Sequence, residues 1–331
     1  THTHTHIATH THTHILDGKL AEFKAMKVAR GKRWATMTAA KRRRVEAAHK
    51  AEAGKLMCLP RHVHVVAIEK VLWSRRHGLL MLMALAEGGD VTAWMRGLRG
   101  EIVERAGGEV GQAEWVRVLK VLLGTALGLR HLHGLGLVHQ DMKPGNVLMF
   151  GDDVAKVSDF GLVGGMEGFE ARVAAASSGG ASGGLSEGVG RGDTSVSLHG
   201  GTPGYRAPEQ AAGRRVTSKA DVWGYGMFVF QVVSYVCGRR WNLREATSGA
   251  DTVGSADGRS GTPPSFQLAD STTSAPAGRT QLDPTRLAAA VHKDVAALKA
   301  AVTRQACAAW VEGACELVLA CVCLSSEARP S

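Results

Sequence analysis

The chain has 331 residues, enough for one two-lobed domain or two small ones, and it carries a formal net charge of +10. Hydrophobic residues make up 44% of the chain but aromatic residues only 5%, so we expect a core of small and aliphatic side chains. Its longest apolar runs are shorter than the ~20 residues of a membrane-spanning helix, which excludes a transmembrane segment in this sequence.

The amino-terminal segment is a nearly pure alternation of Thr and His and has no initial Met. Because both residues can be encoded by a CA dinucleotide repeat, we interpret residues 1–18 as a low-complexity segment and assign it no fold. A basic run follows at residues 41–44. Such a run can contact nucleic acid or an anionic membrane, but a solvated helix face is the simpler interpretation. We therefore expect no specific nucleic-acid partner.

The six cysteines include no Cys-x-x-Cys pair, and no signal peptide precedes them. This usage is typical of reduced, mostly buried thiols rather than of disulfides or a zinc site. The sequence therefore predicts an intracellular, cytoplasmic chain.

Apolar runs and their spacing predict short strands first and helices later. The expected strands include residues 25–28, 63–72 and 79–85, and the expected helices include residues 38–57 and 115–133. Two stretches, at about residues 174–200 and 247–280, are rich in small and polar residues and poor in large apolar ones. They cannot bury enough surface to offset their ordering entropy, so we predict two disordered insertions.

Residues 139–146 read His-Gln-Asp-Met-Lys-Pro-Gly-Asn, and Asp-Phe-Gly begins thirteen residues after Asn146, at Asp159. A carboxylate base, an ammonium group and two oxygen ligands for Mg²⁺ are the groups that phosphoryl transfer requires. Asp141 is the candidate to accept or orient the proton of an attacking hydroxyl. Lys143 is the candidate to offset charge on the transferred group, and Asn146 and Asp159 are the candidate Mg²⁺ ligands.

Together these two motifs resemble the catalytic loop and the magnesium-binding motif of protein kinases. In that resemblance a Lys at position 143 marks the serine/threonine class. Residues 201–209, Gly-Thr-Pro-Gly-Tyr-Arg-Ala-Pro-Glu, resemble the end of a kinase activation segment. The resemblance implies that Thr202 hydrogen-bonds near Asp141 and Lys143 and that this segment receives the substrate chain.

Two structural contacts follow from the same resemblance. Glu209 is expected to pair with Arg329, and Asp221 is expected to accept hydrogen bonds from the catalytic-loop backbone. Gln140 stands where the family usually has an arginine that pairs with a phosphorylated residue, and Gln has no charge for such a pair. Phosphorylation is therefore not expected to be a strict on-switch at the nearby candidate sites, Thr194, Ser195 and Ser197.

The first part of the nucleotide site is less regular. Lys27, in the sequence Ala-Met-Lys, matches the family lysine that contacts the α- and β-phosphates. Its partner is expected to be a helix glutamate. Glu52 is the first choice, and Glu46 stays open because the gap from Lys27 to Glu52 is longer than usual.

The hinge between the lobes is expected where an apolar run ends in Glu-Gly-Gly-Asp. Met83 would lie behind the adenine ring of ATP, and the backbones of Ala84 and Ala86 would bind its edge. Asp90 would face the ribose. Leu148, in the larger lobe, would lie beneath the adenine ring.

One departure concerns the glycine-rich loop that covers the phosphates, because Gly18 is the only glycine upstream of Ala25. The resemblance spans about residues 21–331, so we expect a chain that is cut at both ends. It implies an α+β, two-lobed fold with a small, incomplete β-rich lobe at residues 19–86 and a larger helical lobe at residues 87–331.

The resemblance also implies an ATP- and Mg²⁺-dependent kinase that phosphorylates Ser or Thr in proteins. The alternative is a pseudokinase or a truncated kinase fragment that acts as a binding scaffold. The intact catalytic-loop residues argue for the enzyme, and the missing glycine-rich loop argues for the scaffold.

Overall fold

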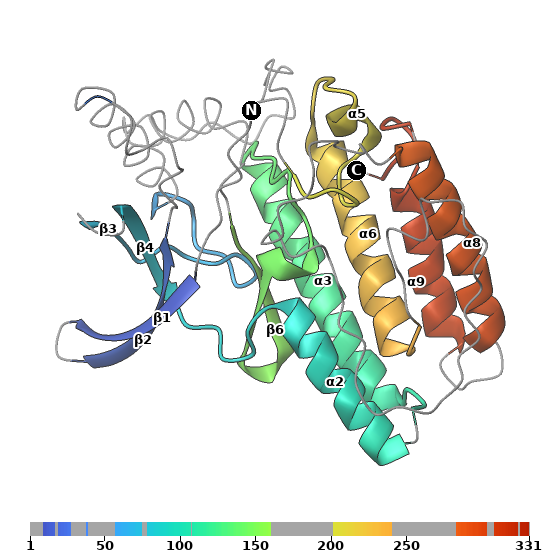
Figure 1. Ribbon diagram of the computed structural model, residues 1–331, viewed down its shortest axis with the longest axis horizontal. Helices are drawn as coiled ribbons and strands as arrows, with labels where there is room; N and C mark the ends of the chain where they lie inside the picture. Colours follow the sequence, from blue (N-terminus) through green and yellow to red (C-terminus); the bar gives the residue numbers. More distant parts are fainter. Residues whose placement is uncertain are drawn as a thin grey trace, which may run out of the picture.

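The structure is a computed structural model with two visible parts, a sheet on one side and a body of helices on the other (Figure 1). Between them lies a short two-stranded sheet (Figure 1). The residues that the structure describes are 9–16, 19–27, 38, 57–74, 78–106, 108–159, 201–239, 283–302, 308–323 and 325–330.

The small lobe is a four-stranded antiparallel sheet with the strand order β1-β2-β4-β3. Its strands are β1 (Thr9–Leu16), β2 (Lys19–Lys27), β3 (Lys70–Ser74) and β4 (Gly78–Ala84). Strands β2 and β4 confirm the strands expected near residues 25–28 and 79–85.

Strand β1 corrects the expectation that the Thr-His segment has no fold. The segment pairs along its length with β2, from Thr9 opposite Met26 to Leu16 opposite Lys19. Alternating β-branched Thr residues suit an extended strand, because a β-branched side chain fits the pleated surface of a sheet. The repeat therefore forms the edge strand of the small lobe.

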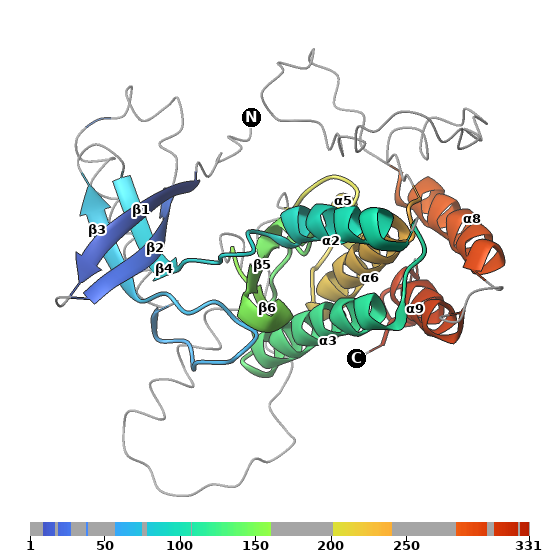
Figure 2. The ribbon, with the colours of Figure 1, turned by 90° about the horizontal axis from the view of Figure 1, so that it is seen from below.

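The strand expected over residues 63–72 begins only at Lys70. The residues before it bond to the large lobe instead. Val65 forms a parallel bridge with Val157, and the Val157 amide donates to the His64 carbonyl at 2.9 Å. These bonds take up backbone groups that a longer β3 would have used, so this loop joins the two lobes (Figure 2).

Several sequence predictions lie outside the described residues. Of the helix expected at residues 38–57, only Thr38 and Met57 are described, and Thr38 is not helical. The other predictions that fall on undescribed residues concern the basic run at 41–44, Glu46, Glu52, Phe160, Gly161 and the whole of the two expected insertions.

In its described part, the large lobe contains four long helices and one medium helix, with a short hairpin on the side of the small lobe (Figure 2). They are α2 (Val91–Ala106), α3 (Gln112–Gly134), α6 (Ser218–Val236), α8 (Pro284–Val302) and α9 (Ala308–Cys321), with the one-turn helix α5 (Pro208–Ala211). The hairpin is formed by β5 (Val147–Phe150) and β6 (Val154–Val157).

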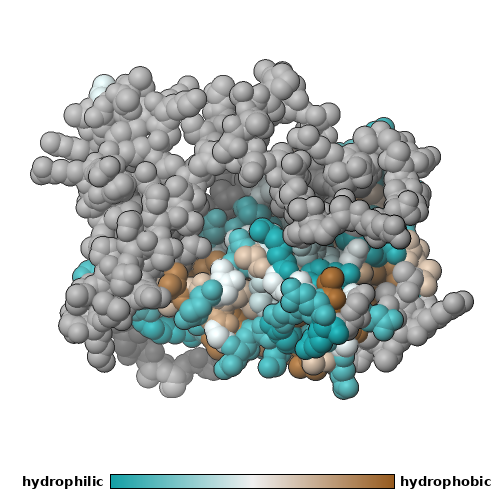
Figure 3. All heavy atoms as spheres, turned by 60° about the horizontal axis from the view of Figure 1, so that its bottom comes forward, coloured by the Kyte–Doolittle hydropathy of each residue, from teal (hydrophilic) through white to brown (hydrophobic). Residues whose placement is uncertain are grey.

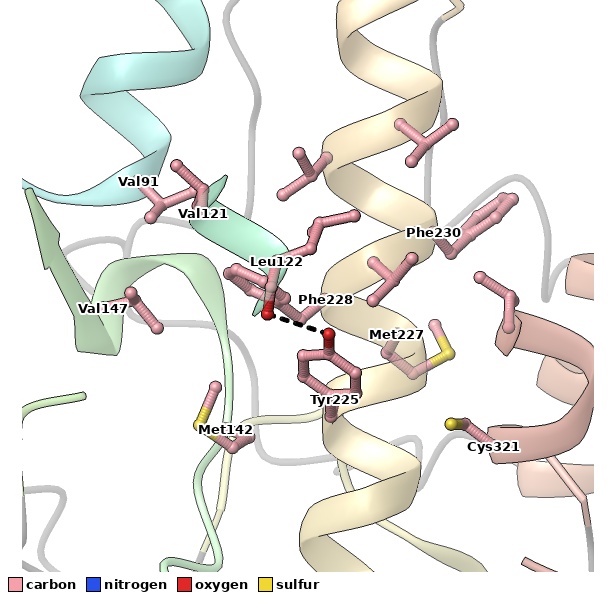
Figure 4. Close-up of a cluster of buried hydrophobic side chains, with 14 of the residues drawn as sticks. Val91, Val121, Leu122, Met142, Val147, Tyr225, Met227, Phe228, Phe230 and Cys321 are labelled. Carbon is pink, nitrogen blue, oxygen red and sulfur yellow. Dashed lines mark hydrogen bonds between the residues drawn. The ribbon is translucent and has the colours of Figure 1, made fainter. Parts of the chain in front are cut away.

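Helix α6 forms the centre of this lobe because it is apolar on nearly every side. It packs against α2, α3, α8 and α9. Trp223, Phe228 and Phe230 on α6 are almost completely buried, so the few aromatic residues contribute strongly to a core that is otherwise mainly aliphatic. Across the α3–α6 contact, the Tyr225 hydroxyl donates to the Leu122 carbonyl at 2.9 Å (Figure 4).

On the face shown in Figure 3, the described surface is mainly hydrophilic, with separate small hydrophobic patches. None of the helices in the described part of the chain combines the length and apolar character that a bilayer crossing demands.

Candidate active site

The catalytic loop is fastened to the first turn of α6 by the buried carboxylate of Asp221. Its Oδ2 accepts the His139 amide at 2.8 Å, and its Oδ1 accepts the Gln140 amide at 2.7 Å. The His133 ring, from α3, also contacts Oδ2 through Nε2 at 2.8 Å. The expected contact between Asp221 and the catalytic-loop backbone is therefore confirmed, and it holds Gln140 in a left-handed conformation, with φ of 69°.

Asp141 is the centre of the site, and its carboxylate accepts four hydrogen bonds. The amide and hydroxyl of Thr202 both donate to Oδ1 at 2.7 Å. Lys143 Nζ and Asn146 Nδ2 donate to Oδ2 at 2.6 and 3.0 Å. Lys143 Nζ also donates to Thr202 Oγ1 at 2.6 Å, so base, cation and hydroxyl form one closed network.

The loop after Lys143 is a single 3-10 turn, Pro144–Asn146, with Pro at its first position. Proline suits this position because its fixed φ matches the turn and its missing N–H would have had no partner. The turn directs the Asn146 side chain back onto Asp141, where Nδ2 also donates to the Asp141 carbonyl at 2.7 Å. Local geometry thus places Asn146 beside Asp141.

Asp159 is brought toward Asn146 by the hairpin between them. Beyond the last strand pair, the Ser158 amide and hydroxyl donate to the Asn146 carbonyl at 2.8 and 3.0 Å. The Ser158 carbonyl in turn contacts His139 Nε2 at 2.8 Å. Asn146 directs its amide nitrogen to Asp141. Its amide oxygen and the Asp159 carboxylate are hard oxygen donors of the kind that suit Mg²⁺.

Three of the four expected adenine-binding residues gather in one small buried cluster. It contains Met83, Ala86 and Leu148, together with Val66 from the loop that joins the lobes. The hinge also runs beside β5, since the Met149 amide donates to the Gly89 carbonyl at 2.9 Å. The structure thus brings together Met83 and Leu148, one from each lobe, whose side chains the family resemblance assigned to the same ring.

Two other hinge residues, Ala84 and Asp90, lie outside this cluster. Ala84 is exposed. Asp90 caps helix α2, because its Oδ1 accepts the Ala93 amide at 2.8 Å. Asp90 also forms a backbone bridge with Leu148, so the residue assigned to the ribose lies at the edge of the candidate site.

Lys27 is the last residue of β2 and stands opposite Leu80 of β4. Its backbone therefore lies in the strand next to the hinge strand. The partner choice between Glu52 and Glu46 falls on undescribed residues.

A hollow of about 410 Å³ lies away from the catalytic loop, beside the loop that joins the lobes. It is lined by Ala84, Phe150 and Lys156 among others, but by none of the catalytic-loop residues. This hollow is therefore distinct from the phosphoryl-transfer groups.

The segment that follows Thr202 is anchored to the core by two buried contacts. Arg329 donates to both carboxylate oxygens of Glu209, at 2.6 and 2.9 Å, which confirms the expected pair. The Tyr205 hydroxyl donates to the Gln231 side chain. Burial, and to a lesser extent the charge of Asp141, raise the pKa of Tyr205, so this hydroxyl remains a donor.

Sequence reasoning missed one residue of this region, Gln210. Its side chain is buried and bonds both to the Ala207 amide and to the Gln140 carbonyl, each at 3.0 Å. The only local sign was a polar residue in the first turn of a short helix. Its partner lies 70 residues earlier, which no local pattern reveals.

Comparison with known proteins gives a consistent result. The protein kinase domain family matches residues 11–240. The chain is 36% identical over 124 residues to the receptor-like kinase TMK2 of Arabidopsis thaliana, a match that covers 37% of this chain and 12% of that protein. It is 37% identical over 129 residues to the serine/threonine-protein kinase PCRK1 of Arabidopsis thaliana, covering 38% and 25%.

A longer match is to the CBL-interacting protein kinase 4 of Oryza sativa subsp. japonica, with 31% identity over 176 residues. It covers 53% of this chain and 32% of the relative, so the chain spans less than a third of each of these three proteins. The family match extends over more than half of the chain and includes both the small-lobe strands and the catalytic loop. The chain therefore belongs to the protein kinase domain family and has its two-lobed fold.

Proposed function

We propose that this chain is an ATP-dependent protein serine/threonine kinase that transfers the γ-phosphoryl group of MgATP to Ser or Thr hydroxyls of proteins. The observation that carries this proposal is the closed network of Asp141, Lys143 and Thr202. One relative is named a serine/threonine-protein kinase, which supports the choice of acceptor hydroxyl.

In this reaction the substrate oxygen bonds to the γ-phosphorus while the bond from that phosphorus to the departing ADP oxygen breaks. Asp141 would hold the attacking hydroxyl and receive its proton, and Lys143 would offset charge on the transferred group. A carboxylate has about four lone-pair positions, and four donors already use those of Asp141. An incoming hydroxyl must therefore share or displace one of them.

The remaining roles belong to the nucleotide and the cation. Asn146 and Asp159 would hold Mg²⁺, which supplies positive charge at the phosphate oxygens when it is bound. Lys27 would contact the α- and β-phosphates. Adenosine would be bound by the hinge side and the floor of the site, formed by Met83, Ala84, Ala86, Asp90 and Leu148.

A scaffold without turnover is the second candidate. It is favoured by the strand β1, because the Thr-His segment occupies the position before β2 and Gly18 is the only glycine there. A kinase with a single glycine in this region would position the phosphates less well, and positioning supplies much of the catalysis in phosphoryl transfer.

The free cysteine thiols among the described residues support an intracellular location for this activity. We also infer the lobe boundary at about residues 86 and 87, within the hinge. The strands of the sheet precede this boundary and helix α2 follows it.

The test is transfer of labelled phosphate from ATP, with magnesium, to peptides that differ only in a Ser, Thr or Tyr acceptor. Asp141→Asn should abolish transfer to Ser and Thr. Asp152→Asn is the matched control, because Asp152 is an exposed carboxylate outside the network. Wild-type transfer no greater than that of Asp141→Asn would favour the scaffold, and transfer to Tyr alone would refute the acceptor class.

A further inference from the structure

Gln210 joins the activation-segment end to the catalytic loop with both ends of its amide. Its Oε1 accepts the Ala207 amide and its Nε2 donates to the Gln140 carbonyl, both at 3.0 Å. An N–H can only donate and a carbonyl can only accept, so these two partners fix the orientation of the Gln210 amide. The side chain is 9% exposed, so water offers little competition for either bond.

The carbonyl that Gln210 holds belongs to the peptide unit between Gln140 and Asp141. The N–H of the same unit donates to His139 Nδ1 at 3.3 Å. On the other side of Gln140, its amide is held by Asp221. Gln210 therefore supplies the bond that fixes the peptide plane from which the Asp141 side chain projects.

The side chain of Gln140 does not make this link itself. Gln140 is 5% exposed, and its Nε2 is buried with no hydrogen-bond partner within the part of the chain that the structure describes. Gly201 crosses the same carbonyl closely, because a Cβ on Gly201 would lie 2.9 Å from the Gln140 oxygen. Gly201 also has a φ of +94°, which favours glycine. The main-chain carbonyl of Gln140 is thus the meeting point of the two segments.

We propose that Gln210 is a positioning residue that holds the catalytic loop and residues 201–209 together without a phosphate group. Its kinetic consequence rests on the proposed kinase function, whereas its effect on the backbone does not. Loss of the Nε2 donor leaves a buried carbonyl without a partner, which disfavours the positioned state. The result should be looser backbone at both segments and slower transfer, with little effect on nucleotide binding.

The central variant is Gln210→Glu, which keeps the size of the side chain and the acceptor for Ala207 but removes the donor to Gln140. Gln210→Met removes both bonds and keeps a similar volume. The matched control is Gln112→Glu, the same change at an exposed position of α3. Each full-length protein is measured by hydrogen exchange of residues 137–143 and 201–212, by thermal unfolding, and by kcat and KM for ATP and a peptide.

We expect Gln210→Glu and Gln210→Met to exchange about tenfold faster than wild type in both segments, with α6 and the control unchanged. Their kcat should fall about tenfold, with less than a twofold change in the KM for ATP. The loss in Gln210→Glu should shrink as pH is lowered toward 5.5, because a protonated carboxyl group again donates. Gln210→Met should show no such recovery relative to wild type at the same pH.

The proposal would be overturned if the Gln210 variants exchanged at the wild-type rate in both segments, or if their exchange were faster to the same extent over the whole chain. Recovery of kcat in Gln210→Met by Asp at positions 194, 195 and 197 would also overturn it, because a negative charge would then replace the amide. If wild type transfers no phosphate but the exchange pattern is as expected, the positioning role stands and the proposed kinase function fails.

Discussion

At the scale of single residues, three side chains and one backbone amide determine the hydrogen bonding of the Asp141 carboxylate. Thr202 reaches it from a segment about 60 residues away, yet contributes two of its four hydrogen bonds. One of these comes from the backbone and one from the hydroxyl, so substitution of the side chain removes only the second. This separation makes the hydroxyl accessible to experiment.

Thr202→Val should lower kcat about tenfold or more. The variant keeps the hydrogen bond from the backbone amide to Asp141 but removes the hydroxyl that accepts a hydrogen bond from Lys143. Thr202→Ser retains the hydroxyl and should stay within about threefold of wild type. Steady-state kinetics on one Ser peptide would measure both. Equal activity of the Val and Ser variants would show that the hydroxyl contributes nothing to transfer.

The structure brings Asp141, Lys143 and Asn146 together, as the sequence indicated, because all three lie within one short loop. The arrangement of residues 139–146 is determined within the loop itself, because one 3-10 turn returns the Asn146 side chain to Asp141. Gln210 could not be predicted in this way, because its role depends on how α5 meets a loop far away in the sequence. The Glu209–Arg329 pair is equally distant, but it was expected because the family resemblance implies it.

At the scale of secondary-structure elements, two of the charged contacts in the described part of the large lobe join segments that are far apart in the sequence. One joins α5 to the chain after α9 through Glu209 and Arg329. The other joins α2, α3 and the β5–β6 turn through Asp153. Its Oδ1 accepts Trp94 Nε1 and its Oδ2 accepts Arg117 Nε, both at 2.8 Å.

Arg329→Met should destabilise the protein by about 3–5 kcal/mol, because it leaves the Glu209 carboxylate mostly buried without its cation. Arg286→Met is the control, since the Arg286 side chain is 71% exposed and should contribute at most about 0.5 kcal/mol. Chemical denaturation would give both values. Similar losses in the two variants would contradict the importance of burial at Arg329.

Asp153 should make stability depend on pH. Burial tends to raise its pKa. The hydrogen bonds from Arg117 and Trp94, together with the charges of Arg117 and Lys120, outweigh burial and hold the pKa below the ordinary 3.8. A pKa lowered by folding stabilises the folded state above the ordinary value, and this contribution is lost as pH falls through the lowered value. Asp153→Asn should therefore destabilise at pH 7 and progressively less below about pH 4.

Urea unfolding across this pH range would test the Asp153 prediction. Asp152→Asn is again the matched control, because Asp152 is the exposed neighbour with the same φ of 59°. A difference between wild type and Asp153→Asn that stays constant down to pH 3 would show that the Asp153 charge does not matter.

Element predictions succeeded where periodicity was clear and failed where pairing was not local. Helix α3 and strand β4 match their expected positions within a few residues. Strand β1 was missed because a repetitive composition obscured a pattern whose partner, β2, provides the evidence for a strand. Strand β3 starts late because the preceding loop bonds to β6, a contact that is visible only in three dimensions.

At the scale of the whole molecule, the loop that joins the lobes rests directly on the backbone of α3. A Cβ on Gly128 would collide with the His64 carbonyl and lie 2.9 Å from Val157 Cγ2. A Cβ on Gly124 would lie 2.8 Å from His64 Nδ1, and that ring nitrogen contacts the Ala155 carbonyl at 2.9 Å. The loop that joins the lobes therefore contacts α3 at two glycines, where the helix presents no side chain.

Gly128→Ala should destabilise the protein by about 1–3 kcal/mol, because the added methyl group meets a backbone atom that cannot easily move. Gly100→Ala on α2 should stabilise it by about 0.5–1 kcal/mol, since alanine favours helix and has open space there. The opposite signs make thermal unfolding of the pair a sensitive comparison. Stabilisation by both changes would refute the close contact.

The conformation of Gln140 and Asp159 has a wider consequence. Both are non-glycine residues with positive φ, at 69° and 63°, and each costs about 1–2 kcal/mol relative to a right-handed conformation. This strain persists only while the surrounding lobe enforces it. The geometry of the site therefore depends on the stability of α6 and its neighbours. A variant weakened far from the site should lose catalytic geometry at temperatures where the lobe as a whole is still folded.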